Sequence, residues 1–534
     1  MNRRTLLSGL SALAAAACGR PGATGPKPAA LSEQLAALAR RYEALMTEHG
    51  LHEWERYAGK SVAGPAAQAA MERLRRAEAD VFAEAKRLLD AHPRHAVAPR
   101  ERALWQAGAL GLSLLGDPEA ARLADELEHV INDHHFELDG RRLTRSDLSA
   151  MRRSPDATVR RSTRSIEHGL HRRTAAIARK LLQRRQRLAR QLGATSFHSA
   201  LTAVRGVDAD ARRELSRVEE RTRGPMQRLR ERLRVELGLQ QLAPWDLEHA
   251  VERSSSPPPD ERFPADRAME AAFGLYRAFG IDLNVPRLDI TVRDFAFGGQ
   301  AIAVRVPGDA RLVVRPMPGA RFYTTLIHEL GHAYAITRTN ADHPLYAGYE
   351  WVPGLMDPAY AEGVAEVFGR LFDVPEVLRE HFGLDEKESE ALIAQRRLQS
   401  LVSARRTLAQ VELERALHDA PEGDLDALSL AVERRLGPTD LPEDAEPVWA
   451  TTPFIATYPG YTQSYLLAAM VAVQVREALQ ARFADGWLSP AAGEFLTQAF
   501  VRDGAKLTLG EKLRRTTGRG IDAGPLLEFT VPAR

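Results

Sequence analysis

Apolar residues recur at every third or fourth position along most of the chain, which is the spacing of amphipathic helices that pack one face against a core. Short apolar runs bounded by glycine and proline predict strands over 287–292, 302–306 and 311–314. We therefore expect a mainly α protein, a large two-lobed helical bundle around a deep cleft, with a small β-sheet next to the helix at 321–338. The predicted helices cover residues 31–92, 100–115, 117–136, 139–193, 208–237, 266–279, 321–338, 388–418, 423–436 and 465–483.

The helix predicted over 321–338 carries the sequence His-Glu-Leu-Gly-His. On a helix His328 and His332 are one turn apart, about 40° around the axis, so both imidazoles face the same way. Two neutral imidazoles suit a divalent ion of borderline softness, most often zinc. Glu329 lies about 100° further round, where it can take a proton from a metal-bound water. The opposite face is apolar; the alternative, a solvated face with two surface histidines, leaves the His-Glu-His spacing to coincidence.

A second helix with the same design follows Asp357-Pro358, a pair typical of a helix start. Its apolar face carries residues at positions i, i+3, i+4 and i+7, and its opposite face carries Glu362 and Glu366 one turn apart. If the two helices pack antiparallel, Glu362 becomes the third metal ligand, and Glu366 hydrogen-bonds a ligand histidine and orients it. Glu350, in the preceding loop, is a competing third ligand, and a solvated face is the alternative for both helix glutamates.

Composition and charge narrow the class of protein. The chain has 534 residues, with 73 Lys+Arg against 71 Asp+Glu, a balance that argues against a nucleic-acid binder. The 44% hydrophobic share excludes wholesale disorder. Arginine pairs between residues 139 and 193 predict exposed helix faces paired with nearby acids; the alternative is a basic surface for anionic lipid or nucleic acid.

The first 18 residues predict export. Asn2-Arg3-Arg4 precedes an apolar run that is too short to span a bilayer, so this stretch indicates a signal of the twin-arginine type. Cys18 is the single cysteine of the chain, and Ala-Ala-Ala before it is similar to a bacterial lipobox. We therefore expect a protein of the bacterial cell envelope, lipid-anchored through Cys18 on the extracytoplasmic side of a membrane; the alternative is an ordinary signal peptide with an incidental cysteine.

The clearest interruption in the helical pattern is the Ser-Ser-Ser-Pro-Pro-Pro run at 254–259. It separates a purely helical part from the part that carries the predicted metal site. The predicted organisation is a signal and lipobox at 1–18, a flexible tether at 19–30, a helical N-terminal part at 31–253, a loop at 254–260 and a zinc-binding catalytic part at 261–534.

Six segments, spread over most of the mature chain, carry further signatures: 181–197 (LLQRRQRLARQLGATSF), 244–247 (PWDL), 325–333 (TLIHELGHA), 361–369 (AEGVAEVFG), 458–466 (YPGYTQSYL) and 516–518 (TTG). In their order and spacing they resemble the helical zinc oligopeptidases of the gluzincin type, the angiotensin-converting-enzyme group and the thimet-oligopeptidase group. Taken singly, only the metal-helix segment is specific.

The resemblance assigns roles to the residues found above. It implies Glu329 as the general base and Glu366 as the residue that supports a ligand histidine, and it prefers Glu362 to Glu350 as a ligand. It also implies Tyr465, with Tyr458, as donors to the oxyanion of the tetrahedral intermediate. The implied zinc ligands are His328, His332 and Glu362.

The chain departs from this family in two places. The family has a histidine shortly before the tyrosines, but residues 449–457 contain none. The lysine with which converting enzymes grip a C-terminal carboxylate has no counterpart either, which puts dipeptidyl-carboxypeptidase specificity in doubt.

The sequence thus predicts a monomeric metallopeptidase that holds one zinc ion per chain and hydrolyses short oligopeptides in the cell envelope, with a zinc-activated water and Glu329 as base. The missing histidine motivates an alternative, a zinc-binding, peptide-binding or scaffold lipoprotein of the same fold that has lost turnover.

Overall fold

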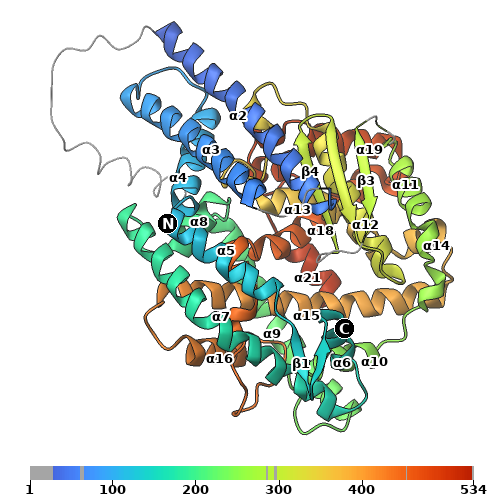
Figure 1. Ribbon diagram of the computed structural model, residues 1–534. Helices are drawn as coiled ribbons and strands as arrows, with labels where there is room; N and C mark the ends of the chain where they lie inside the picture. Colours follow the sequence, from blue (N-terminus) through green and yellow to red (C-terminus); the bar gives the residue numbers. More distant parts are fainter. Residues whose placement is uncertain are drawn as a thin grey trace.

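The computed structural model describes residues 28–60, 65–283, 285, 287–293, 298–452 and 454–531. Cys18 and the predicted signal lie outside these residues, so lipid anchoring stays a prediction. Within the described residues helices dominate, and the strands form two small sheets (Figure 1). The predicted mainly α fold with a small sheet is confirmed.

In the described residues up to Arg253, all regular elements are helices apart from one hairpin. Asp117 begins α5 as predicted, because its side chain accepts a hydrogen bond from the backbone N–H of Ala120 and Pro118 follows it. The elements are α2 (Pro28–Tyr57), α3 (Pro65–Ala91), α4 (Pro99–Leu115), α5 (Pro118–Asn132), β1 (Phe136–Leu138), β2 (Arg141–Leu143), α6 (Arg145–Arg152), α7 (Ala157–Gln191), α8 (Phe197–Val204), α9 (Ala209–Glu236) and α10 (Leu247–Arg253).

The hairpin of β1 and β2 corrects the prediction of one long helix over 139–193. Asp139 and Gly140 both have positive φ, 52° and 74°, the conformation that a two-residue hairpin turn requires. The strands pair antiparallel, with Phe136 opposite Leu143. The hairpin therefore separates α5, which ends at Asn132, from α6, which begins at Arg145.

The second half contains the larger sheet and the two helices of the predicted metal site. Its elements are α11 (Ala268–Ala278), β3 (Leu288–Val292), β4 (Gly299–Arg305), β5 (Asp309–Val314), α12 (Ala320–Arg338), α13 (Pro358–Gly369), α14 (Pro375–Phe382), α15 (Glu386–Asp419), α16 (Leu425–Leu436), α17 (Phe454–Thr457), α18 (Gln463–Phe483), α19 (Pro490–Leu496), α20 (Leu509–Thr517) and α21 (Gly524–Thr530).

The three-stranded sheet has the order β3-β5-β4, so β4 forms one edge. It pairs antiparallel with β5, with Ala301 opposite Leu312. One step beyond the strand, Gly298 and Arg315 lie opposite each other, and the backbone N–H of Arg315 donates to the carbonyl of Gly298. Gly298 and Arg315 are therefore a hydrogen-bonded pair. Because hydrogen-bonded and non-bonded pairs alternate in an antiparallel ladder, the backbone groups of Gly299 and Ala301 point away from β5, toward the free edge.

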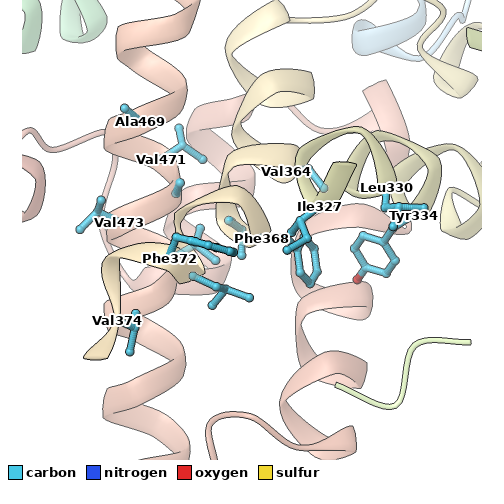
Figure 2. Close-up of a cluster of buried hydrophobic side chains, with 14 of the residues drawn as sticks. Ile327, Leu330, Tyr334, Val364, Phe368, Phe372, Val374, Ala469, Val471 and Val473 are labelled. Atoms are coloured by element: carbon cyan, nitrogen blue, oxygen red, sulfur yellow. The ribbon is translucent and has the colours of Figure 1, made fainter. Parts of the chain in front are cut away.

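A shared apolar core fixes α12 against α13 and α18 (Figure 2). Leu330 of α12, Phe368 of α13 and Val471 of α18 are all fully buried. The helices approach closely at Gly331, where an added Cβ would lie 2.6 Å from the Cα of Ala365. The predicted apolar backs of both helices are therefore confirmed, and their polar faces are turned to the same side.

A second apolar cluster joins the N-terminal helices to the loop before α13. Tyr42 of α2 and Trp105 of α4 pack in it with Tyr349 and Val352 of that loop. Figure 1 shows α2 running beside β4. The cluster thus joins residues from both sides of 254–260; the proposed division of the chain, the two lobes and the cleft stay predictions.

Arginines of α7 make ion pairs with acids from distant segments. Arg161 contacts Asp444 at 2.8 Å, Arg164 contacts Glu433 at 2.9 Å, and Arg184 contacts Asp117 at 2.6 Å. These pairs match the interpretation of paired helix faces. In the described part of the chain, no helix has both the length and the apolar character to span a membrane.

Candidate metal centre and active site

The two histidines of α12 meet at their Nε2 atoms. His328 and His332 are one helical turn apart, and their Nε2 atoms lie 3.2 Å apart. Their side chains are about one-fifth exposed, whereas Leu330 between them is buried in the core behind. The sequence pattern therefore produced the arrangement it predicted, an apolar back and an imidazole front.

Glu362 of α13 brings a carboxylate to the same place. Its Oε2 lies 3.3 Å from Nε2 of His328 and 3.7 Å from Nε2 of His332. Among the residues the structure describes, these three form the one group of histidine, cysteine or acidic side chains whose donor atoms could hold a metal ion, all within 4.8 Å of one another. Two imidazole nitrogens and one carboxylate oxygen are the donor set of a catalytic zinc site with an open position.

Glu350, the competing ligand, is not a member of this group. It lies in the loop before α13, close enough for the charges of Glu362 and Glu329 to act on it. Burial first, and then these two charges, raise the pKa of Glu350 to about 8. The structure therefore brings Glu362 to the two histidines and leaves Glu350 as a nearby carboxylate.

Glu366 contacts His328 from the other side. Its Oε1 lies 3.3 Å from Nδ1 of His328, and its Oε2 lies 3.2 Å from Nε of Arg370. Arg370 in turn contacts the buried carboxylate of Asp373 at 2.7 Å, and Arg396 donates to the same carboxylate. Although burial opposes it, the hydrogen bonds to the two glutamates raise the pKa of His328, so the surroundings of this imidazole favour positive charge.

Glu329 is buried against the edge strand. It is only 7% exposed, and its side chain packs on Gly299, where an added Cβ would lie 2.4 Å from the Cγ of Glu329. Burial raises the pKa of Glu329 to about 7, and the charge of Glu362 adds to this effect. The charge of His328 and a hydrogen bond with the backbone of Ala301 oppose it. The carboxyl thus has a pKa near neutrality at the edge of β4, beside His328, His332 and Glu362. These three side chains are called the metal group below.

The three tyrosines at and just before the start of α18 make different contacts. The hydroxyl of Tyr461 donates to Oε1 of Glu362 at 2.8 Å. The ring of Tyr465 lies 5.5 Å from that of Tyr461, and Tyr465 is 43% exposed, which leaves it able to contact a ligand. Tyr458 also packs on Tyr461, at 5.9 Å, but its hydroxyl interacts with Tyr57 of α2.

Tyr461 is the residue of this group that sequence reasoning missed. It caps the carboxylate oxygen that faces away from the histidines, so that Oε2 is the oxygen turned toward them. Its sequence signal was present, because it stands four residues before Tyr465 in the same YPGYTQSYL segment. The segment alone does not tell which of its three tyrosines meets the metal helices.

The arrangement of the fold has known parallels among solved structures. No protein-family model matches the chain, and no curated protein matches it. The structure of PZ peptidase A with an inhibitor matches with a TM-score of 0.64 and 15% identity over 96% of this chain and 97% of that one. An oligoendopeptidase F matches with a TM-score of 0.65 and 16% identity, covering 94% and 95%.

A third match is the M32 carboxypeptidase from Deinococcus radiodurans R1, with a TM-score of 0.59 and 15% identity over 94% of this chain and 98% of that one. Each likeness extends over nearly the whole length of both chains. At these identities the matches show a shared, mainly helical fold, in agreement with the predicted fold class.

Proposed function

We propose that this protein is a zinc-dependent metallopeptidase that hydrolyses short oligopeptides. The observation that carries the proposal is the meeting of His328, His332 and Glu362 with Glu329 beside them, on the face of α12 opposite its apolar core. The three solved structures that share the fold are named as peptidases, which supports the same class of reaction.

The donor set fits one zinc ion, held by the two imidazole nitrogens and by Oε2 of Glu362. Glu366 would fix the ring orientation of His328 through Nδ1, and Tyr461 would fix the carboxylate of Glu362. A bound zinc would supply Lewis acidity at this position.

Glu329 would carry the proton through the reaction. A carboxyl with a pKa of about 7 can accept a proton from an attacking water and release it to the departing amine at neutral pH. The packing of Glu329 on Gly299 holds the carboxyl at one place beside the metal group during both transfers.

The free edge of β4 offers a place for the peptide. The backbone groups of Gly299 point to this edge and can hydrogen-bond an extended chain, in the manner of strand addition to a sheet edge. Those of Ala301 are already engaged, by the Glu329 carboxyl and by the side chain of Gln300. This edge lies directly beside Glu329. An extended peptide paired here would run past both the base and the metal group, and a folded protein could not adopt that conformation.

Tyr465 is our choice for the donor to the developing oxyanion, because it is exposed next to Tyr461 and Glu362. Tyr458, the other tyrosine predicted for this role, is engaged by Tyr57 on α2. We assign Tyr458 to the contact between α2 and the tyrosines.

For localisation we propose export and attachment to a membrane through Cys18, on the basis of the leader sequence alone. The enzyme would then act as an anchored monomer on peptides of the cell envelope. A Cys18→Ser variant should move from the membrane fraction to the soluble fraction; a Cys18→Ser variant that stays in the membrane fraction would contradict the anchor.

The proposal is tested by metal analysis together with peptide cleavage. The purified protein should hold about one zinc per chain and cleave quenched-fluorescent peptides. Glu329→Gln should keep its zinc and lose ~10²–10⁴-fold in rate, because the base is absent. Glu376→Gln, on α14, is the control and should match the parent.

Two results would overturn the proposal. A Glu329→Gln variant as fast as the parent would show that the base is wrong. Zinc binding without cleavage of any peptide in a broad library would favour the alternative, a protein of the same fold that binds peptides without turnover.

A further inference from the structure

The segment that carries Tyr461, residues 454–462, is here called the tyrosine loop. Its first half is held by Arg185 of α7, which donates hydrogen bonds to the carbonyl oxygens of Ile455 and Ala456, the second at 2.7 Å. Arg185 is 4% exposed and lies about 270 residues earlier in the chain. A buried guanidinium from a distant helix thus fixes the backbone at the start of the loop.

The second half of the tyrosine loop is held in the same way. Nε of Arg205, the residue that ends α8, donates to the carbonyl of Pro459 at 3.2 Å. The backbone N–H of Gly460 donates to Glu414 of α15 at 2.5 Å, and the side chain of Gln463 donates to the carbonyl of Gly460. Arg205 and Glu414 are 7% and 4% exposed.

Arg205 also touches the functional tyrosine itself. Its guanidinium carbon lies over the ring of Tyr461, 5.4 Å from the ring centre. One side chain therefore contacts both the backbone two residues before Tyr461 and the face of its ring. Arg205 thus contacts both the backbone of the tyrosine loop and the tyrosine that the loop presents.

Burying charged groups is costly, and well-packed apolar residues can often replace a buried ion cluster without loss of stability. A loop that only had to be rigid would therefore not need Arg185, Arg205 and Glu414. What this loop presents is a hydroxyl that must stay 2.8 Å from Oε1 of Glu362. A displacement of a few tenths of an ångström in the loop changes that contact directly.

We propose that Arg205 is a positioning residue that holds the hydroxyl of Tyr461 on Glu362 and thereby strengthens metal binding at His328, His332 and Glu362. The inference rests on the metal site of the proposed function. Arg205 acts through Tyr461 and touches neither the metal group nor the reacting atoms. Partners that orient a metal ligand typically contribute 10–100-fold to metal affinity.

The test measures the zinc dissociation constant by competition with a chelator, without any peptide. Tyr461→Phe should weaken zinc binding by about 10–100-fold and Arg205→Met by about 10-fold, with Arg205→Lys in between the parent and Arg205→Met. If Arg205 acts through Tyr461, the double variant Arg205→Met/Tyr461→Phe should bind zinc no more weakly than Tyr461→Phe alone.

A matched control separates positioning from loss of a buried arginine. Arg405 is 3% exposed and donates to the backbone carbonyls of Leu436 and Glu219, with no contact to the tyrosine loop among the described residues. Arg405→Met should lower stability and leave the zinc dissociation constant unchanged. An equal loss of zinc affinity in Arg405→Met and Arg205→Met would overturn the proposal.

A crystal structure of Arg205→Met gives a reading that does not depend on metal. The hydroxyl of Tyr461 should move out of hydrogen-bond reach of Glu362. If it stays in place, or if the two substitutions multiply in the double variant, Arg205 is not the positioning residue. A parent protein that binds zinc but cleaves no peptide would refute the peptidase and leave this inference standing; failure to bind zinc would refute both.

Discussion

The two sides of the metal group are built on different principles. On one side, α12 and α13 present His328, His332 and Glu362 from regular helices whose apolar backs share one core (Figure 2). On the other side, Tyr461 is presented by the tyrosine loop, which begins with the single turn of α17 and whose backbone is held by buried charged side chains from α7, from the end of α8 and from α15. Periodic packing places the first set, and specific long-range hydrogen bonds place the second.

Because of this difference, we expect a single substitution to displace neighbouring groups less on the helix side than on the loop side. A helix backed by a continuous core keeps its place when one polar side chain changes. A loop that depends on a few hydrogen bonds can shift when one of them is lost. The comparison predicts effects that depend on which side is changed.

The largest effect is expected for Glu362, the proposed third ligand. Glu362→Gln should weaken zinc binding by more than the ~10–100-fold typical of residues behind a ligand, because it removes a bonding carboxylate. Glu350→Gln should keep its zinc, because Glu350 stands outside the metal group. Chelator competition on both variants decides between the two glutamates; loss of zinc only in Glu350→Gln would reverse the assignment.

The next effect concerns the exposed tyrosine. Tyr465→Phe should lower kcat by ~10²–10³-fold with zinc content unchanged, since one donor to the oxyanion is removed. Tyr458→Phe is the matched control in the same segment and should change kcat little, because its hydroxyl contacts Tyr57. Steady-state kinetics on one peptide tests both, and equal losses would contradict the separate roles.

A smaller and equal effect is expected for Glu366 and Tyr461, which contact the proposed ligands His328 and Glu362 from opposite sides. Glu366→Gln and Tyr461→Phe should each weaken zinc binding by about 10–100-fold. Only Tyr461→Phe should mask a further substitution of Arg205, because Glu366 is held by Arg370 instead. If Arg205→Met weakens zinc binding further in both variants, Arg205 does not act through Tyr461.

The last effect concerns pH and stability rather than zinc or catalysis, and it tests a buried histidine next to α15. His198 lies beside His418 of α15, and burial lowers the pKa of His198 to about 4. The folded protein thus keeps His198 neutral, while the unfolded chain takes up a proton below about pH 6.5. Above that pH the group does not change the free energy of unfolding, and below it the protonation of the unfolded chain lowers the free energy of unfolding progressively.

Relative to His198→Gln, the free energy of unfolding of the parent should therefore fall by about 2 kcal/mol from about pH 7.5 to about pH 5. Urea unfolding of both proteins at the two pH values measures this difference. If the free energies of unfolding of the parent and of His198→Gln differ by the same amount at both pH values, His198 is not held neutral in the folded protein.

Local sequence patterns were sufficient for the helix side. The spacing of His328, Glu329 and His332, the Asp357-Pro358 start of α13 and the one-turn spacing of Glu362 and Glu366 all depend on neighbours within a few residues. They predicted which side chains share a face, and the structure brings these faces together. These local patterns left Glu362 and Glu350 both open; the family resemblance preferred Glu362, and the packing of α12 on α13 brings Glu362 to the two histidines.

The loop side could not be predicted in the same way. Its contacts join Arg185 and Arg205 to a segment more than 250 residues later, and no periodicity connects them. The selection of Tyr461 over Tyr458 and Tyr465 depends on these contacts. The hairpin at Asp139-Gly140 is a different case, since its turn signal was local and the helical pattern around it prevailed in the prediction.

The most direct measurement is a crystal structure of the zinc-loaded protein with anomalous scattering recorded at the zinc edge. We expect one peak within about 2.0–2.2 Å of Nε2 of His328, Nε2 of His332 and an oxygen of Glu362. A peak bonded elsewhere, or two histidines that bind the ion without Glu362 and without any other acid, would contradict this expectation.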